Sequence, residues 1–296
     1  MGAGAAVAAA AAAAGIRMPA LAEIAPLGVG LGYRPPFRAD LFRNREAVDF
    51  LEIVADHYFD AQREKRDELD LLANNFTLIP HGLDLSIGSA EGIDSAYLDR
   101  FAALIARLDP PYWSEHLAFT RAGGIAFGHL ACLPYTNEAV EIVARNVETV
   151  RRRIGVPLIL ENITATALIP GAEMDEPEFV GAVLEATGCG WLCDVTNLFA
   201  NAFNAGREAA AELDRWPWQR VVQMHFAGGR ISDGVLIDSH DGPTTPEVWR
   251  LLEAAVARSQ VKGIILERDE RLPPFGELLA ELDKARTIGR RLGRWP

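Results

Sequence analysis

Residues 157–164 read PLILENIT, a short run of aliphatic residues that ends in an acid and an amide. Such a run suits a strand that is buried on both faces, as strands are in parallel sheets. Glu161 and Asn162 stand at its carboxyl end, where parallel α/β proteins carry their functional side chains. The run therefore predicts the strand of a βα unit with functional residues at its end.

The same pattern occurs eight times along the chain. The apolar runs cover residues 27–33, 48–58, 76–87, 112–119, 157–164, 190–197, 220–228 and 261–269. Segments with helical spacing of apolar residues lie between them, at 95–108, 136–153, 176–187, 246–259 and 275–292. This alternation predicts a single α/β domain at residues 25–296, a closed (β/α)8 TIM barrel. A doubly wound open sheet is the alternative.

The composition limits the class of protein. The 296 residues carry 29 Lys and Arg against 41 Asp and Glu, a net charge of −12, which argues against a general nucleic-acid binder. No run of 18 apolar residues is present, so we expect no membrane span. The Ala-rich residues 1–24 lack the basic start of a signal peptide, and we expect a disordered tail there. The three cysteines form no CxxC pair, which favours a reduced, cytoplasmic protein.

Ionisable side chains recur at the carboxyl ends of the predicted strands. In a parallel barrel those ends meet at one mouth, so the side chains would converge there. The candidates are His81, His116, Glu161, Asp194, His225 and Glu267, with Asn197 three residues after Asp194, and Asp238 and His240 in the segment after the seventh run.

Each of these residues taken alone is more often structural than a metal ligand, and separate structural roles stay an alternative. Burying several carboxylates together without cations is costly, because desolvation and like charges both disfavour the ionised form. Bound cations remove that conflict, so we predict a polynuclear metal centre at the mouth. The donors are imidazole, carboxylate and amide groups, which suit Fe, Mn, Zn or Co.

Two further residues are candidates for catalysis or contact with a substrate. His57 ends the second run and has either such a role or a structural one, and Asn162 follows the acid that ends the fifth run. The glycines of RAGG at 121–124 predict a hairpin or mobile loop near the same mouth.

The stretch LIDSHD at 236–241 is expected to be a loop after the seventh strand. Asp238 and His240 are two residues apart, so both can face one ion from an extended segment. Asp241 then points elsewhere, which makes it a third catalytic candidate, either for proton handling or for support of the ligands.

The stretches DFLEIVADHYF, HGLDLSIGS, SEHLAF, LENIT, CDVTNLFANAFN and LIDSHDGPTTPEVW follow one another in the order seen in a known family. Over residues 27–290 the chain resembles the DUF692 proteins, which are multinuclear non-heme iron-dependent oxidative enzymes and include the methanobactin biosynthesis oxidase and the oxidase of the 3-thiaglutamate pathway. The resemblance implies a xylose-isomerase-like barrel that binds two or three Fe ions. It assigns one ion to His81, His116 and Glu161, a second to Glu161, Asp194, His225 and Glu267, and a third to Asn197, Asp238 and His240.

The implied activity is oxidation, with O2 as cosubstrate, of cysteine residues in a ribosomally synthesised precursor peptide. A small leader-binding protein is the implied partner. ADHYF, LENI and LERD depart from the commoner family sequences beside the implied ligands, which affects the identity of the substrate more than metal binding. A Zn- or Mn-dependent hydrolase or sugar isomerase on the same barrel is the first alternative, and a non-catalytic metal-binding or scaffold protein is the second.

Overall fold

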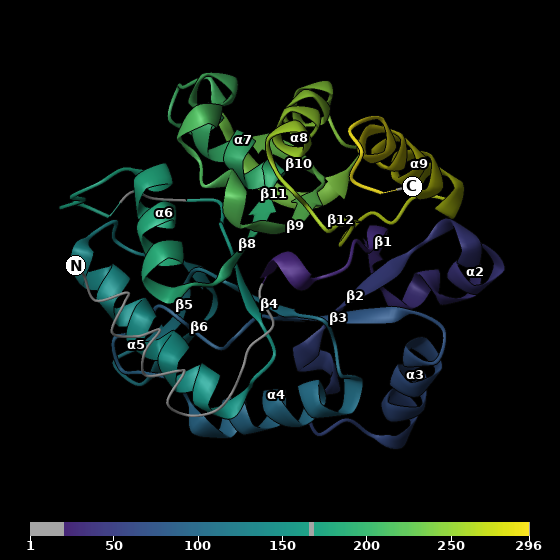
Figure 1. The fold of residues 1–296 in the computed structure, drawn as a ribbon, viewed down its shortest axis with the longest axis horizontal. Coiled ribbons are helices and arrows are strands. Elements are labelled where there is room, and N and C mark those ends of the chain that lie inside the picture. Colours follow the sequence, from purple (N-terminus) through teal and green to yellow (C-terminus); the bar gives the residue numbers. More distant parts are fainter. Residues whose placement is uncertain (1–20, 166–168, 296) are drawn as a thin grey trace.

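The computed structural model describes residues 21–165 and 169–295, which contain a closed barrel of parallel strands surrounded by helices (Figure 1). The strands follow the order β1-β12-β9-β8-β7-β4-β3-β2 around the ring. Each lies within one of the predicted runs, so the predicted TIM barrel is confirmed. They are β1 (Gly28–Gly32), β2 (Phe50–Val54), β3 (Thr77–Gly82), β4 (Trp113–His116), β7 (Leu158–Glu161), β8 (Gly190–Asp194), β9 (Val221–Phe226) and β12 (Gly263–Leu266).

Strands β1 and β12 close the ring, because they pair in parallel from Gly28 opposite Gly263 to Leu31 opposite Leu266. The closed ring excludes the open doubly wound sheet. A side chain at Gly30 would not fit, since its Cβ would lie 2.5 Å from the carbonyl oxygen of Phe50 on β2. Glycine therefore permits the close approach of the first two strands.

The packed part of the domain includes residues that precede the first strand. Leu21–Glu23 form a short 3-10 helix, η1, and Ile24 is buried inside the barrel. Of the tail expected at 1–24, residues 1–20 lie outside the described residues, and 21–24 belong to the packed domain.

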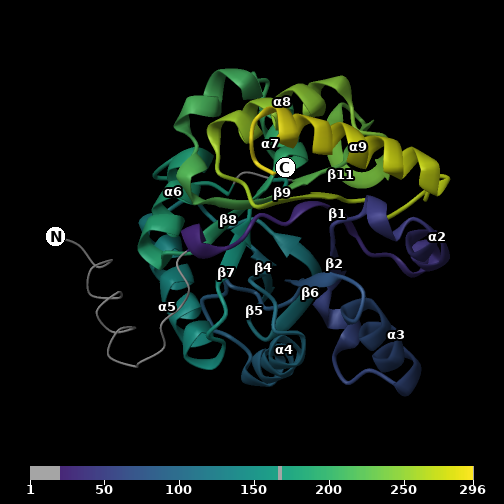
Figure 2. The ribbon, with the colours of Figure 1, turned by 45° about the vertical axis from the view of Figure 1, so that its right-hand side comes forward.

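The helices cover the outside of the barrel, as Figures 1 and 2 show from two sides. Asp94, Thr136, Asp175 and Thr245 accept backbone N–H groups at the starts of α4, α5, α6 and α8, which explains where the predicted helices begin. In the described part of the chain, no helix combines the length and apolar character needed to cross a membrane. The helices are α2 (Arg38–Arg43), α3 (Arg63–Ala73), α4 (Ser95–Leu108), α5 (Asn137–Arg153), α6 (Glu176–Thr187), α7 (Val195–Asn204), α8 (Pro246–Arg258) and α9 (Phe275–Arg291), with 3-10 segments η2 (Pro35–Phe37), η3 (Arg45–Ala47), η4 (Ala55–Tyr58), η5 (Ala209–Arg215) and η6 (Trp218–Arg220).

Two antiparallel hairpins follow β4 and β9. The first consists of β5 (Phe119–Ala122) and β6 (Ile125–Ala131), and it turns at Gly123 and Gly124 with φ of +60° and +73°. These left-handed conformations favour glycine, and the hairpin predicted at 121–124 is confirmed. The second consists of β10 (Gly228–Ser232) and β11 (Val235–Gly242). The stretch LIDSHD lies in β11, so the prediction of a loop there is wrong.

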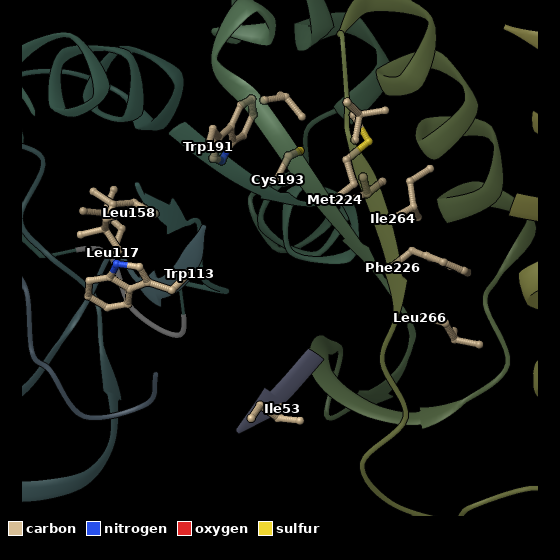
Figure 3. Close-up of a cluster of buried hydrophobic side chains, with 14 of the residues drawn as sticks. Ile53, Trp113, Leu117, Leu158, Trp191, Cys193, Met224, Phe226, Ile264 and Leu266 are labelled. Atoms are coloured by element: carbon tan, nitrogen blue, oxygen red, sulfur yellow. The ribbon is translucent and has the colours of Figure 1, made fainter. Parts of the chain in front are cut away.

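Side chains on the outer face of the strands pack against the helices (Figure 3). Trp191 and Cys193 of β8 and Met224 of β9 are completely buried in this layer. Because side chains alternate along a strand, Cys193 faces away from Asp194, as predicted. Burial raises the pKa of the Cys193 thiol well above its ordinary value. A neutral thiol in this environment is a packing residue.

The interior of the barrel contains a separate apolar layer near the amino ends of the strands. On β2, β3, β7, β8 and β12, every second residue points to the same side, so the residue two positions beyond each member points inward, one level nearer the mouth. On β9 the pairing with β8 shifts register beside Val222, so Met224 points outward instead. The layer consists of Ile24, Phe50, Ile79, Tyr112, Ile159, Leu192, Val222 and Ile265.

Candidate metal centre

A polar layer lies directly above the apolar layer inside the barrel. Its members on five strands stand two residues beyond an inward apolar residue and are between 0 and 7% exposed; they are Glu52, His81, Glu161, Asp194 and Glu267. His116 on β4 and His225 on β9 complete this layer. The strand alternation thus places ionisable groups where TIM barrels commonly pack branched aliphatic side chains.

The predicted ligands form three groups, and within each group one donor atom per residue lies within 4.8 Å of the others. Glu161 belongs to the first and second groups, and Asp194 belongs to the second and third. The three groups therefore form one continuous chain across the mouth. They are His81, His116 and Glu161; Glu161, Asp194, His225 and Glu267; and Asp194, Asp238 and His240.

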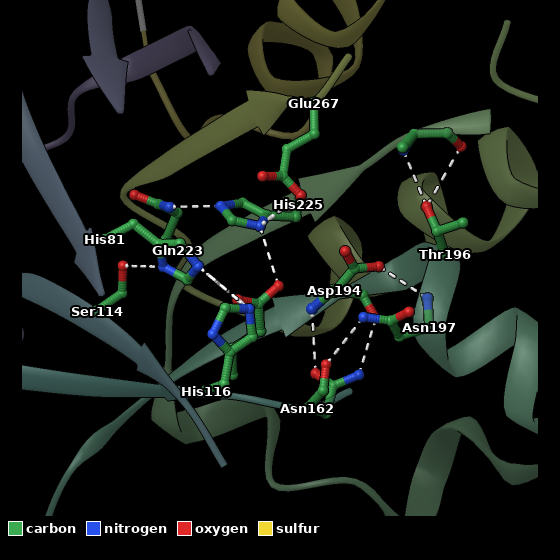
Figure 4. Close-up of polar contacts among 12 residues, drawn as sticks. His81, Ser114, His116, Asn162, Asp194, Thr196, Asn197, Gln223, His225 and Glu267 are labelled. Atoms are coloured by element: carbon green, nitrogen blue, oxygen red, sulfur yellow. Dashed lines mark hydrogen bonds and ion pairs between the residues drawn. The ribbon is translucent and has the colours of Figure 1, made fainter. Parts of the chain in front are cut away.

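In the first group, the rings of His81 and His116 lie side by side (Figure 4). Their Nε2 atoms face Glu161. The distances to Glu161 Oε2 are 3.4 and 3.5 Å. At Nδ1, His81 faces Ser114 Oγ at 2.8 Å, and His116 faces the Gly82 carbonyl at 3.2 Å and, farther away, Glu115 Oε1 at 3.5 Å. An Nδ1–H that donates to such an oxygen leaves the Nε2 lone pair free for a metal.

In the second group, His225 is oriented the other way round. Its Nδ1 lies 3.1 Å from Glu161 Oε1 and 3.2 Å from Glu267 Oε2. Its Nε2 points away from the group and lies 2.9 Å from Glu52 Oε1. His225 is completely buried, and both of its ring nitrogens face carboxylates of the described residues.

The third group lies beside the hairpin β10–β11. Asp238 Oδ1 is 2.5 Å from His240 Nε2, and the two side chains are 20% and 12% exposed, which makes this group the most open of the three. His240 has a φ of +46°, a conformation that is uncommon outside glycine. Strained backbone of this kind recurs at functional sites, where the surrounding structure holds a side chain in place.

Asp194 joins the third group, although the resemblance assigns it to the second group alone. Asn197 lies beside it and lines the same cavity. Its amide is already engaged, because Nδ2 donates to the carbonyl of Asn162 at 3.1 Å and Oδ1 accepts the hydroxyl of Thr164. A role for Asn197 as a ligand stays a prediction.

Four atoms of these groups are buried and make no regular hydrogen bond with the described residues: Glu161 Oε2, Asp194 Oδ2, Asp238 Oδ1 and His240 Nε2. Glu161 Oε2 has ion-pair contacts with His81 and His116, and Asp238 Oδ1 has one with His240 Nε2. A buried polar atom without a partner costs about 1–3 kcal/mol. Cations would satisfy all four atoms at once, and the nitrogen and carboxylate donors suit Fe, Mn, Zn or Co. The residues present therefore fit a polynuclear metal centre.

Without a bound cation, burial and neighbouring charges shift the pKa values of residues in these groups. Burial raises the pKa of Asp194 well above its ordinary value, and the Asp238 and Glu161 carboxylates raise it further. Burial opposes protonation of His116, but Glu161 and Glu115 outweigh it and raise the pKa of His116 to about 9. In the metal-free site, protons thus occupy groups that must lose them to bind a metal.

The groups form the floor of a cavity of about 460 Å³. Its walls include Ile53, Val54, Leu83 and Leu130, and apolar walls around a few polar groups are typical of a ligand site. His57 on η4 lines the cavity and is exposed, so the structure brings this predicted residue to the mouth.

The structure places Asn162 and Asp241 outside the residues that line this cavity. The Asn162 amide joins β7 to β8, since it accepts the backbone N–H of Asp194 and donates to its carbonyl, both at 3.0 Å. Asp241 pairs with Arg230 at 3.0 Å and with Arg271 at 3.5 Å. Both side chains have structural partners, and a direct catalytic role for either stays a prediction.

Sequence reasoning missed Glu52 and Gln223, which lie inside strands β2 and β9, before the carboxyl ends of those strands. Gln223 Nε2 donates to Glu52 Oε2 at 2.6 Å, and both residues are buried. Attention to strand ends alone overlooks such positions. The available signal is a polar residue with inward-facing parity in an otherwise apolar run, as in FLEIV at 50–54.

The sequence signature of a family described as "RiPP precursor modification enzyme MbnB/TglH/ChrH" matches residues 28–290. The chain belongs to this family. It is 38% identical over 261 residues to a UPF0276 protein from Rhizorhabdus wittichii, covering 88% of this chain and 94% of the relative. It is 36% identical to a UPF0276 protein from Caulobacter vibrioides, covering 88% and 93%. The resemblance to DUF692 proteins is confirmed, and the chain is a member of a family of enzymes that modify precursors of ribosomally synthesised peptides.

Solved structures similar to this MbnB/TglH/ChrH family member include a xylose isomerase domain protein from Planctomyces limnophilus, with a TM-score of 0.58 at 12% identity over 92% of this chain and 99% of that chain. A D-psicose 3-epimerase gives a TM-score of 0.55 at 13% identity over 90% and 100%. At such identities the likeness concerns the fold alone, and it confirms the xylose-isomerase-like barrel.

Proposed function

We propose that this protein is a multinuclear non-heme iron oxidase that uses O2 to modify cysteine residues of a ribosomally synthesised precursor peptide. The observation that carries the proposal is the chain of three donor groups joined by Glu161 and Asp194, with four buried atoms that make no regular hydrogen bond with the described residues. Two shared carboxylates allow adjacent ions to lie side by side, which supports two or three Fe ions.

The first and second groups supply imidazole and carboxylate donors that are almost completely buried. Bound iron supplies one-electron chemistry with O2 as cosubstrate. The protein holds the ions through Glu161 and Asp194 and limits access of water through the apolar walls of the cavity. The three groups contain no cysteine, so a thiolate from the substrate would be the one soft ligand at the centre.

The surface around the mouth supports a peptide substrate and a protein partner. The two hairpins carry exposed apolar side chains, with Ile125 65%, Ile231 61% and Val235 46% exposed. Of these residues, Val235 also lines the cavity. Exposed apolar residues beside a functional cavity are typical of a surface that binds another chain. We propose that this surface receives the precursor peptide together with a small leader-binding protein.

Two measurements test the proposal. Protein purified without oxygen and loaded with Fe(II) should show iron in Mössbauer spectra and consume O2. Co-expression with a short cysteine-containing peptide encoded beside the gene should change the mass of that peptide. The change should require O2 and should disappear when the peptide cysteines are replaced by serine.

Variants separate the metal centre from the rest of the surface. Glu161→Gln should abolish the mass change, whereas the matched variant Glu185→Gln, at an exposed glutamate of α6 outside the three groups and the two hairpins, should preserve it. Zinc or manganese in place of iron, without O2 consumption, would favour the hydrolase or sugar isomerase. Full modification by Glu161→Gln would favour the non-catalytic scaffold.

A further inference from the structure

Glu52 lies in the middle of β2 and is 3% exposed. Its two oxygens are 2.9 and 3.0 Å from Nε2 of His225. The other ring nitrogen of His225, Nδ1, faces Glu161 and Glu267 in the second donor group. Glu52 therefore contacts a candidate ligand from behind, on the side away from the metal position.

Counting protons shows what this contact does. A nitrogen that binds a metal must present its lone pair, so a neutral His225 that binds through Nδ1 carries its proton on Nε2. That N–H is buried and needs an acceptor. The Glu52 carboxylate is the acceptor within hydrogen-bond distance among the described residues.

Gln223 also adjoins His225, because the Nε2 atoms of the two side chains are 3.0 Å apart (Figure 4). The Gln223 amide nitrogen is a donor and cannot accept the proton. Its Oε1 accepts the hydroxyl of Tyr112 at 2.8 Å, and its Nε2 donates to Glu52 at 2.6 Å. The reversed amide would place an oxygen against the Glu52 carboxylate. Tyr112 and Gln223 thus hold Glu52 in place and leave it as the acceptor.

His225 differs in this respect from the other histidines of the centre. His81 and His116 direct Nε2 toward their group, and the nearest oxygens at Nδ1 are a hydroxyl for His81 and a backbone carbonyl for His116, with the Glu115 carboxylate farther from His116 at 3.5 Å. His225 directs Nδ1 toward the second donor group and has the Glu52 carboxylate at Nε2. Glu52 is linked in turn to Gln223 and Tyr112, and all of these side chains are buried. A buried carboxylate behind a ligand fixes the tautomer of the imidazole and increases its basicity.

We propose that Glu52 is a positioning residue that holds His225 in the tautomer protonated on Nε2 and so presents Nδ1 to the second metal ion. The inference rests on the proposed metal centre. Gln223 and Tyr112 act through Glu52, because they fix the orientation of its carboxylate. The chain Tyr112–Gln223–Glu52–His225 connects the floor of the barrel to the metal ligands.

The test uses Co²⁺ as the metal probe, titrated anaerobically into the metal-free full-length protein. Glu52→Gln should weaken binding of one Co²⁺ by about 10–100-fold, the usual effect of removing such a partner. It should also change the visible spectrum of the bound ion. Tyr112→Phe is the matched control, because it removes a buried hydroxyl from the far end of the chain and leaves the carboxylate in contact with His225.

The exchange E52Q/Q223E supplies the sharper test. It moves the carboxylate to position 223, which also adjoins Nε2 of His225, and the new amide at position 52 can donate to it. We expect this double variant to recover most of the Co²⁺ affinity. In the Zn²⁺-loaded protein, ¹⁵N spectra of the histidines should show a proton on Nε2 of His225 in the wild type and in the exchange variant.

Each outcome has a definite meaning. Wild-type affinity in Glu52→Gln overturns the inference. A loss of affinity that the exchange does not restore also overturns it, since Glu52 would then be a structural residue alone. If Glu52→Gln does not fold, as judged by circular dichroism, Glu52→Asp and the exchange variant are compared with wild type on the same terms. Absence of metal binding in the wild-type protein would instead defeat the proposed function.

Discussion

Replacing Asp194 by Asn should stabilise the metal-free protein and weaken its metal centre. Asp194 is completely buried, and burial together with Asp238 and Glu161 raises its pKa well above the ordinary value. Asn keeps the shape of the side chain and can still accept the backbone N–H of Asn197, which Asp194 Oδ1 accepts at 2.7 Å. The substitution therefore removes the charge and leaves the helix cap.

The size of the effect follows from pH. An Asp with a raised pKa destabilises the folded state by about 1.4 kcal/mol for each pH unit above its unfolded pKa of about 3.9, up to the raised pKa. The cost is absent at low pH, is at most about 1.5 kcal/mol at pH 5 and is at most about 4 kcal/mol at pH 7. For a protein of this size, about 1 kcal/mol shifts the Tm by roughly 2–4 °C.

The assay is thermal unfolding of chelator-treated proteins at pH 5 and pH 7, followed by circular dichroism, with metal analysis after loading with Fe(II). Asp194→Asn should melt several degrees above wild type at pH 7, by less at pH 5, and should bind fewer ions. Asp241→Asn is the control, because Asp241 pairs with arginines outside the three groups; it should keep the full metal content. The reasoning is refuted if metal-free Asp194→Asn has a lower Tm than wild type at pH 7. It is also refuted if Asp194→Asn binds as many ions as wild type after loading with Fe(II).

Three further predictions concern the same centre. Iron uptake at pH 7 should release protons, because His116, with a pKa of about 9, must lose its proton to bind. Calorimetry in buffers of different ionisation enthalpy should measure this release, which should decline as the pH rises through about 9. A chelator should remove the ion of the third group first, since Asp238, at 20% exposed, is the most exposed candidate ligand, and simultaneous loss of all ions would contradict this. His240→Ala should lose about one ion per chain by metal analysis, whereas its neighbour variant Ser239→Ala should lose none.

The fold was predictable because the barrel repeats one simple signal. Each strand is a short apolar run, and the helices between them begin at capping residues such as Asp94 and Asp175. The helix α6 also ends where predicted, because Gly188 adopts a φ of +68° beyond its last turn. Periodicity and caps are local properties, so one sequence is enough to read them.

The convergence of the candidate ligands at the strand ends was predictable for a related reason, since parallel strands direct their carboxyl ends to one mouth. The third group was predictable only in part. Its position depends on the hairpin β10–β11 and on the left-handed backbone of His240, and the sequence of that segment resembles an ordinary polar loop. The membership of Asp194 in two groups depends on three-dimensional distances that no spacing along the chain reveals.

Glu52 shows where the rule of strand ends stops. A search of the strand ends alone misses a polar side chain that points into the barrel from the middle of a strand. The apolar floor beneath it contains Phe50 and Ile265, and the outer layer around Trp191 packs the strands against the helices. Those two layers hold the backbone rigid enough to keep uncompensated carboxylates inside the barrel. Because ions that bind the folded centre alone stabilise it by mass action, loading the metals should raise the Tm of the wild type, and this gain should shrink in Glu52→Gln as its affinity falls. If the Tm of both proteins did not depend on metal, bound ions would not contribute to stability, and packing of the apolar layers alone would offset the unfavourable burial of the carboxylates.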